Sequence, residues 1–294
     1  MSDYHVGPYP RVTLFPEDDG ASGGIIRLAI VAAIGGALAG LLGGLFRWFL
    51  QQVYELRIDL LAWADENPAA RWIIPVAIAA IAVAAARLIV RFVPEASGSG
   101  VQHVEANMRG DDEVSPLRII PAKFFGGLLA IGSGLALGRE GPTVQIGATI
   151  GNQAARLAGL SQHDRRTLTA SLAGAGLGVA FSAPLGGAMF VFEEVARAFR
   201  TRLIVATLVA SAAALTVSGW IVGGGPIFSV PNLPAGPHWH LALYALFGLA
   251  LGALGVVYNR SVLLLLDLAG SIRRVPPEII AGAVGGLVAL LGVF

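Results

Sequence analysis

Two residues of opposite charge, Arg139 and Glu140, lie side by side in a part of the chain that is otherwise apolar. They belong to the segment 134–147, in which glycines and a proline flank the charges. An ionisable side chain at membrane depth costs at least about 2.5–3.5 kcal/mol on insertion scales, so it points to function. Glycine and proline here predict that one helix ends and another begins, with free backbone amides at the new N-terminus.

The N-terminus of such a helix attracts negative charge, because its unpaired amides and its dipole are both positive. The Glu140 carboxylate would satisfy these amides, and so would a small anion, so the two compete for one place. Protonation of Glu140 would weaken its hold and admit the anion. The alternative is a glutamate permanently paired with Arg139.

A second candidate is the stretch Gly98–Gln102, with the sequence GSGVQ. Glycines on both sides of Ser99 leave backbone amides and a hydroxyl exposed, a geometry that can replace the water shell of an anion. The alternative is an ordinary Ser/Gly turn between helices.

A third candidate is the pair of carboxylates Glu193 and Glu194, at the end of an apolar run. Adjacent carboxylates oppose each other's ionisation, so one of them is a candidate proton carrier. The alternative is a solvated helix end next to Arg197 and Arg200.

Two further charges, Glu105 and Lys123, are isolated near apolar segments. We expect them to pair with each other or with the region of the two adjacent glutamates, in a structural role.

An enzyme is not expected. The GxSG pattern around Ser22 matches rhomboid-type intramembrane proteases, but Ser22 precedes the first apolar run and the five histidines fall in polar or loop stretches. The histidines have no metal-ligand spacing, and no phosphate-binding or dinucleotide motif is present. We therefore expect neither a metal nor a cofactor.

The composition predicts an all-α polytopic membrane protein. Of the 294 residues 55% are hydrophobic and only 13% are charged, and the mean hydropathy is +0.71. A soluble domain has nearer a quarter of charged residues. The net charge of +1 and the lack of a basic stripe argue against nucleic acid as a partner.

The apolar runs differ in length, which predicts strongly tilted helices and helices that stop inside the membrane. They fall at 25–63, 72–93, 117–137, 143–158, 167–192, 203–224, 239–269 and 277–294. Residues 1–24 are polar and are expected to form a cytosolic leader. Basic clusters are expected on the cytosolic side: they contain Arg87, Arg91, Arg197, Arg200, Arg202, Arg273 and Arg274.

An internal repeat is indicated by small residues that recur at an offset of 212 positions. The glycines at 36, 40 and 43 recur at 248, 252 and 255. Spacings of three or four between small residues are also common in any membrane helix. If the repeat is real, the second copy has barely begun at Phe294, and the chain is somewhat more than half of a duplicated protein.

Together these motifs resemble those of the CLC family of chloride channels and chloride/proton antiporters. Gly98–Gln102 resembles the family's GSGIP motif, with Gln102 in place of the proline, and Gly138–Pro142 is identical to its GREGP motif. The segment from Phe181 to Gly187, running into the adjacent glutamates, resembles its FNAPLAG…EE segment. The resemblance extends from about residue 25 to the C-terminus.

The resemblance implies a role for each candidate. Ser99 and Gly100 would belong to the central chloride site, and Arg139, Glu140 and Gly141 to the outer one. Glu140 would be the gating glutamate. Glu194 would be the inner proton-transfer glutamate, with Glu193 as its neighbour, and Lys123 and Glu105 would be supporting charges.

The resemblance also implies a fold and an activity. We expect an inverted repeat of tilted and broken helices, with a first repeat at 25–224 and an incomplete second repeat at 225–294. The full-length protein would be a homodimer in the bacterial inner membrane, with a cytosolic N-terminus. We expect exchange of chloride and protons; a passive chloride channel and a non-transporting fragment are the alternatives, because the family's GxFxP motif and capping tyrosine are absent from the sequence.

Overall fold

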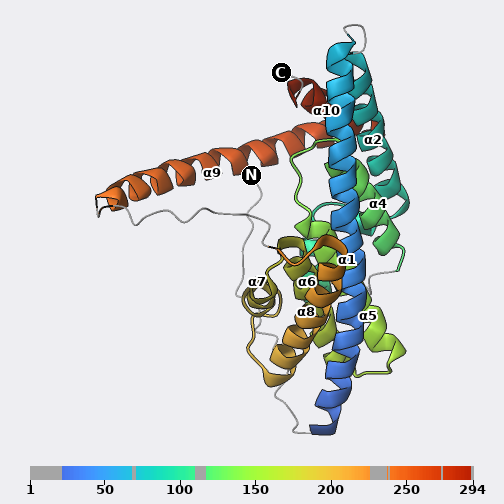
Figure 1. Cartoon of the computed structure of the whole chain (residues 1–294), viewed down its shortest axis with the longest axis vertical. Helices are drawn as coiled ribbons and strands as arrows, with labels where there is room; N and C mark the ends of the chain where they lie inside the picture. Colours follow the sequence, from blue (N-terminus) through green and yellow to red (C-terminus); the bar gives the residue numbers. More distant parts are fainter. Residues whose placement is uncertain are drawn as a thin grey trace.

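The computed structural model describes residues 22–67, 71–109, 117–225, 237, 239–272 and 274–292, and these residues form helices joined by short turns (Figure 1). The elements are α1 (Ser22–Glu66), α2 (Ile73–Phe92), the 3-10 turn η1 (Pro94–Ala96), α3 (Val101–Arg109), α4 (Ile119–Gly132), α5 (Glu140–Leu157), α6 (Gln162–Phe181), α7 (Pro184–Phe190), the π-turn η2 (Val191–Val195), α8 (Thr201–Val222), α9 (His240–Ser271) and α10 (Pro277–Gly292).

Four of these helices, α1, α2, α8 and α9, are long and apolar enough to cross a membrane. The helix α1 has 45 residues, which at 1.5 Å per residue is about 68 Å, far more than the roughly 30 Å of a bilayer core. Two other apolar helices are shorter: α4 has 14 residues, fewer than the roughly 20 of a span, and α10 has 16 described residues. The prediction of an all-α polytopic membrane protein with helices of unequal length is confirmed.

Glycines let α1 lie directly against the backbone of α8. A Cβ atom at Gly36 would come within 2.4 Å of the Ala210 carbonyl oxygen, and one at Gly40 within 2.2 Å of the Ala214 carbonyl oxygen. Without a hydrophobic driving force between helices in lipid, such close packing is a main source of helix association. The first set of recurring glycines therefore forms a helix–helix contact.

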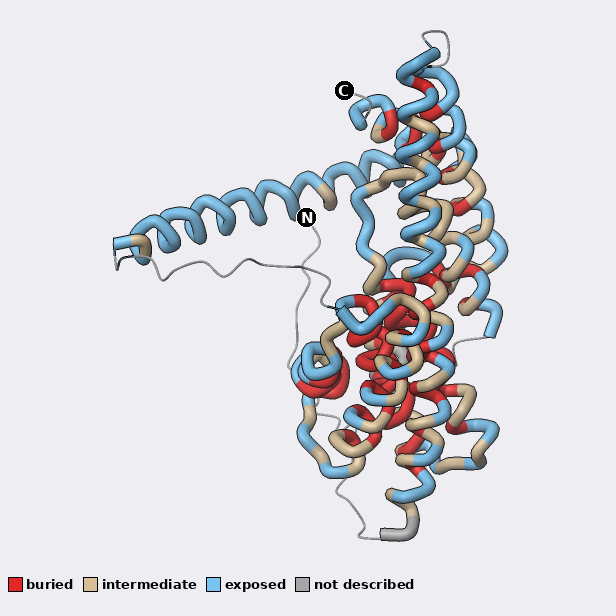
Figure 2. The backbone as a smooth tube through the Cα atoms, in the orientation of Figure 1, coloured by how far each residue is buried: buried red, intermediate tan, exposed pale blue. Residues whose placement is uncertain are grey.

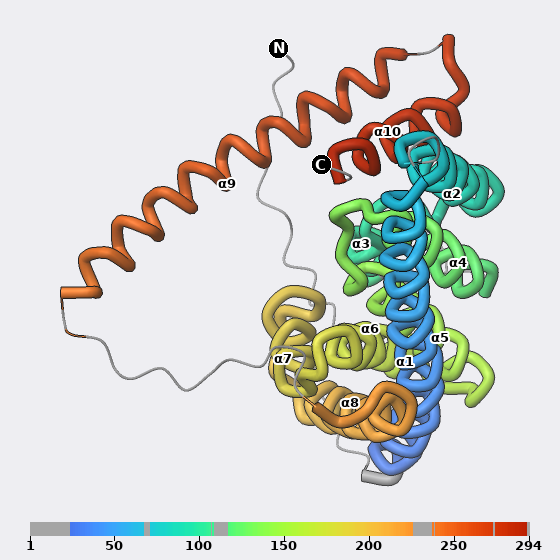
Figure 3. The backbone as a smooth tube through the Cα atoms, turned by 45° about the horizontal axis from the view of Figure 1, so that its top comes forward, coloured from blue at the N-terminus to red at the C-terminus, as the bar shows by residue number. Residues whose placement is uncertain are grey.

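The second set of recurring glycines has different surroundings. No atom lies within 4 Å of a Cβ placed at Gly248, Gly252 or Gly255, and α9 buries none of its described residues. Figures 1 and 3 show α9 extending away from the bundle of α1, α5, α6 and α8. The predicted repeat is visible in sequence spacing, and it stays a prediction.

The buried centre of the molecule consists mainly of α5 and α6, which appear as the continuous buried region in Figure 2. Glycines again allow the contact: a Cβ at Gly147 would lie 2.1 Å from the Leu172 carbonyl oxygen, and one at Gly176 would lie 2.2 Å from the Thr143 carbonyl oxygen. The start of α5 is thereby fixed in a rigid environment.

The apolar run 167–192 is divided between two helices, α6 and α7, although its hydropathy is continuous. Ser182 ends α6 with a left-handed φ of 52°, and Pro184 begins α7. Arg47 of α1 stabilises the end of α6 at this break, because its Nη1 donates to the Val179 carbonyl (2.8 Å) and to Ser182 Oγ (2.9 Å).

The predicted leader, residues 1–24, lies almost entirely outside the described residues.

We expect Gly40→Ala to destabilise the protein, because the new methyl group would collide with the α8 backbone. Overpacking of this kind costs roughly 1–3 kcal/mol, which should lower the midpoint of thermal unfolding in detergent. Gly219→Ala is the matched control: it lies on α8 with nothing within 4 Å of the added Cβ, and alanine favours a helix over glycine. An equal loss in both variants would contradict the packing described here.

Candidate functional site

The turn that carries Ser99 lies between η1 and α3 and depends on two glycines. Gly98 has φ = 65° and Gly100 has φ = 92°, values that residues with a side chain rarely adopt. The Val104 amide donates to the Gly100 carbonyl (3.1 Å), so α3 begins immediately after the turn. Ser99 is therefore exposed next to the N-terminus of a helix.

Buried polar side chains hold this turn from two other helices. Lys123 of α4, which is 5% exposed, donates from Nζ to the Gly98 carbonyl (2.8 Å). Gln145 of α5, which is fully buried, donates from Nε2 to the Glu95 carbonyl (2.8 Å) and lies against Gly100. Because buried hydrogen bonds are costly to leave unmade, these contacts fix the position of Ser99.

An ion pair links η1, which precedes the same turn, to the start of α4. Arg118, just before α4, places Nη2 2.5 Å from Glu95 Oε1. A hydrogen bond from its own backbone amide and the nearby Arg118 guanidinium lower the pKa of the Glu95 carboxyl below its ordinary value. The carboxylate therefore stays ionised and the link to α4 persists at neutral pH.

The start of α5 makes direct contact with the Ser99 turn. A Cβ at Gly141 would lie 2.2 Å from the Ser99 carbonyl oxygen, so only glycine fits here. The Glu140 side chain folds back over Gly138, because a Cβ at Gly138 would lie 1.9 Å from Glu140 Oε1. The carboxylate thus lies at the helix N-terminus, where the sequence placed it.

The two motifs line one cavity of about 650 Å³. Ser99, Lys123, Glu140 and Gly141 all contribute to its wall. The N-termini of α3 and α5 both begin at this wall, and their unpaired amides and dipoles favour negative charge. The arrangement suits a small anion.

Glu140 also lines a second cavity of about 520 Å³. This cavity contains three arginines, Arg47, Arg57 and Arg139, and Glu140 contributes its carboxylate. The excess of positive charge attracts anions. Glu140 is therefore shared by the walls of the two cavities, together with Ile131, Leu137 and Gly138.

Glu193 and Glu194 lie in η2 and line neither of the two cavities. Both are exposed within η2, and Glu194 is 3.9 Å from Arg197, with both side chains largely in solvent. A π-turn at this point is notable because such turns are frequent at functional sites.

Lys123 does not pair with Glu105 or with the adjacent glutamates, although the sequence predicts such a pair. Its amine bonds the Gly98 carbonyl, and within the described residues it has no carboxylate partner. The reason is geometric: α4 presents Lys123 to the glycine turn, where an exposed carbonyl needs a donor. Glu105, half-buried on α3, does not line the Ser99 cavity.

Sequence reasoning missed Gln145 and Arg47. Gln145 is a fully buried amide of α5 that bonds the Glu95 carbonyl, and a polar residue within an apolar run is a signal that was available in the sequence. Arg47 is an isolated charge inside a 45-residue apolar helix, which is a functional signal of the same kind as Arg139.

Comparisons with known proteins identify the family. The family model described as "Voltage gated chloride channel" matches residues 81–294, which is most of the chain. The chain belongs to this chloride channel family, the CLC family. The H(+)/Cl(-) exchange transporter ClcA of Salmonella paratyphi B is 34% identical over 276 residues, and that of Vibrio cholerae is 38% identical over 243 residues.

Solved structures show the same fold. A slow cyanobacterial Cl-/H+ antiporter superposes with a TM-score of 0.83 at 29% identity, covering 91% of this chain and 64% of that structure. A eukaryotic CLC transporter gives 0.74 at 23% identity, covering 90% and 49%. The relatives named here are transporters rather than enzymes. The fold is therefore of the CLC type.

The chain spans little more than half the length of the relatives it matches. The match to the Salmonella relative covers 91% of this chain and 58% of that relative. The match to the Vibrio relative covers 81% of this chain and 52% of that relative.

We expect Gly141→Ala to displace the Ser99 turn and abolish anion binding at this site, because its Cβ would overlap the Ser99 carbonyl oxygen. Calorimetric titration of the purified protein with chloride would measure the loss. Gly126→Ala is the matched control, since Gly126 lines the same cavity and an added Cβ meets only Ile89, at 3.9 Å. Undiminished binding in Gly141→Ala would show that the contact does not shape the site.

Proposed function

We propose that the protein exchanges chloride for protons across a membrane, with Glu140 as the gate. The observation that carries the proposal is the position of Glu140, which lines both the cavity of Ser99 and the arginine-rich cavity. The family and the names of the relatives support chloride and protons as the transported ions.

In this proposal chloride passes by exchange with the Glu140 carboxylate. An anion near Ser99 is stabilised by the amides and hydroxyl of the turn, and by the N-terminus of α5. The deprotonated carboxylate occupies the place that a second anion would take. Protonation removes its charge, the side chain leaves the amides, and chloride moves between the cavities.

Protons are proposed to reach Glu140 from the inner side by way of Glu194, with Glu193 as its neighbour. The support is the resemblance of their segment to the family's EE motif and their place in a π-turn. Lys123 would position the turn of Ser99, and Glu105 would be a supporting charge. No cofactor is required by this mechanism.

The surroundings of the protein follow from the same resemblance. We propose a multi-pass protein of the bacterial inner membrane with a cytosolic N-terminus, and a homodimer when the protein has the full length of its relatives. The domain division at 25–224 and 225–294, with a leader at 1–24, belongs to this proposal.

Two alternatives are open to experiment. A passive chloride channel would share the site but would not accumulate chloride when only a pH gradient is applied. A non-transporting fragment is favoured by one observation, that the chain spans 58% of its Salmonella relative. Reconstitution of the 294 residues in liposomes, followed by a chloride flux measurement, separates the fragment from both transporters.

We expect Glu140→Gln to abolish the coupling of chloride to protons while chloride still moves, because the amide mimics the protonated carboxyl and cannot release a proton. Proteoliposomes under a chloride gradient, with simultaneous pH and chloride electrodes, would measure both fluxes. A proton-to-chloride ratio equal to that of the unaltered protein would refute the role of Glu140.

We expect Glu194→Gln to stop proton movement and leave chloride movement intact, because a proton carrier without a titratable group cannot relay. The control is Glu193→Gln, which removes the neighbouring carboxylate and should reduce proton flux less. If proton transport survived in Glu194→Gln, the residue would be a solvated helix end, as its exposed contact with Arg197 allows.

A further inference from the structure

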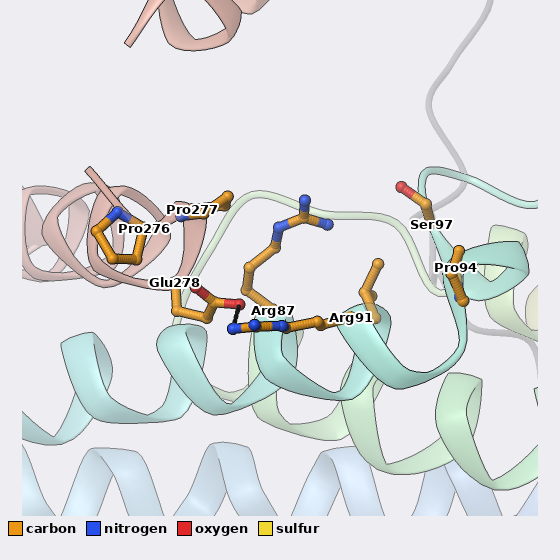
Figure 4. A pocket seen from close by; sticks show the side chains of 8 residues that line it. Arg87, Arg91, Pro94, Ser97, Pro276, Pro277 and Glu278 are labelled. Atoms are coloured by element: carbon orange, nitrogen blue, oxygen red, sulfur yellow. Dashed lines mark hydrogen bonds and ion pairs between the residues drawn. The ribbon is translucent and has the colours of Figure 1, made fainter. Parts of the chain in front are cut away.

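A third cavity, of about 550 Å³, lies where the last turns of α2, the turn η1 and the start of α10 meet (Figure 4). Its wall contains Arg87 and Arg91 from α2, Ser97 from the segment before Ser99, and Glu278 from α10. None of the roles proposed so far uses these residues.

The two arginines of this cavity differ in their partners. Arg91 Nη1 lies 3.5 Å from Glu278 Oε1, and this contact joins α2 to α10. Arg87 has no hydrogen-bond or ion-pair partner within the described residues. In Figure 4 its guanidinium extends from α2 into the open space between Pro277 and Ser97.

A guanidinium carries a fixed positive charge in proteins. Arg87 is half-buried, so its charge is less well solvated than that of a fully exposed side chain. The cavity contains two cations and one carboxylate, which leaves a single positive charge. That charge is matched by one monovalent anion.

Arg87 also connects this cavity to the candidate site. Arg87 and Val90, which share one face of α2 at a spacing of three, line both this cavity and the cavity of Ser99. An anion held at Arg87 is therefore adjacent to the space in which Ser99 and Glu140 lie.

We propose that Arg87, with Arg91 and Ser97, forms a recruitment site for a small monovalent anion that supplies the cavity of Ser99. The guanidinium of Arg87 attracts the anion, and the Ser97 hydroxyl donates a hydrogen bond to it. Arg91 stays bound to Glu278 and keeps the cavity open between α2 and α10. The identity of the anion as chloride rests on the proposed function; the site itself does not.

The chain has no cysteine, so a single introduced thiol can report the charge of the cavity without any transport. Pro94→Cys, in the wall of the cavity, leaves Ser97 in place and would be treated in turn with two methanethiosulfonates, one with a sulfonate group and one with a trimethylammonium group. The ratio of the two rates cancels the thiolate fraction and measures the local potential. Pro276→Cys, which lines the same cavity, is a second reporter if the first variant does not fold.

With Arg87 present, we expect the anionic reagent to react faster than the cationic one, and chloride to slow it relative to gluconate at equal ionic strength. Adding Arg87→Gln should lower the rate ratio roughly three- to tenfold, as loss of one nearby charge predicts, and should remove the effect of chloride. Arg87→Lys should restore both. Arg71→Gln, which removes an arginine paired with Asp65 elsewhere, should change neither.

An unchanged ratio in Arg87→Gln would overturn the proposal. So would protection by inorganic phosphate, or by vesicles containing anionic lipid, at concentrations where chloride has no effect, because the site would then take a phosphate group. In liposomes, Arg87→Gln should raise the half-saturating chloride concentration on one side of the membrane by a similar factor and leave the proton-to-chloride ratio unchanged. Absence of flux in the unaltered protein, with the labelling result intact, would refute the proposed function alone.

Discussion

The contact between the Ser99 carbonyl and Gly141 is the constraint on which the site depends. It brings a helix N-terminus from α5 against a turn that lies some forty residues earlier in the chain. Only a glycine allows the approach, and only left-handed glycines allow the turn. Lys123 and Gln145 then donate to the Gly98 and Glu95 carbonyls, which the turn would otherwise leave bare.

Close packing through glycines also holds the rest of the bundle together. α1 lies on α8, and α5 on α6, through glycines that face carbonyl oxygens. This backbone-to-backbone packing leaves little freedom for the N-terminus of α5 to shift. A rigid frame suits a site where one carboxylate must compete with an anion for a fixed set of amides, since the competition is decided by charge rather than by movement of the helix.

Much of this was predictable from the sequence, and the reason is local. The charges and glycines around Glu140 predict a helix start, and the glycines around Ser99 predict a turn; both follow from backbone preferences of a few residues. The partner of Lys123, the role of Gln145 and the interruption at Ser182 were not predictable in this way, because each depends on which distant carbonyl or arginine approaches in the folded chain. The place of Glu140 in the walls of two cavities is likewise a property of several helices at once.

The exposed length of α9 has a consequence for how one wall of the site is held. None of its described residues is fully buried, so α9 draws little cooperative stability from its neighbours. Val262 and Leu266 of α9 nevertheless line the cavity of Ser99. A local opening of α9 would therefore change one wall of that cavity while the glycine contacts of α1 with α8 and of α5 with α6 persist.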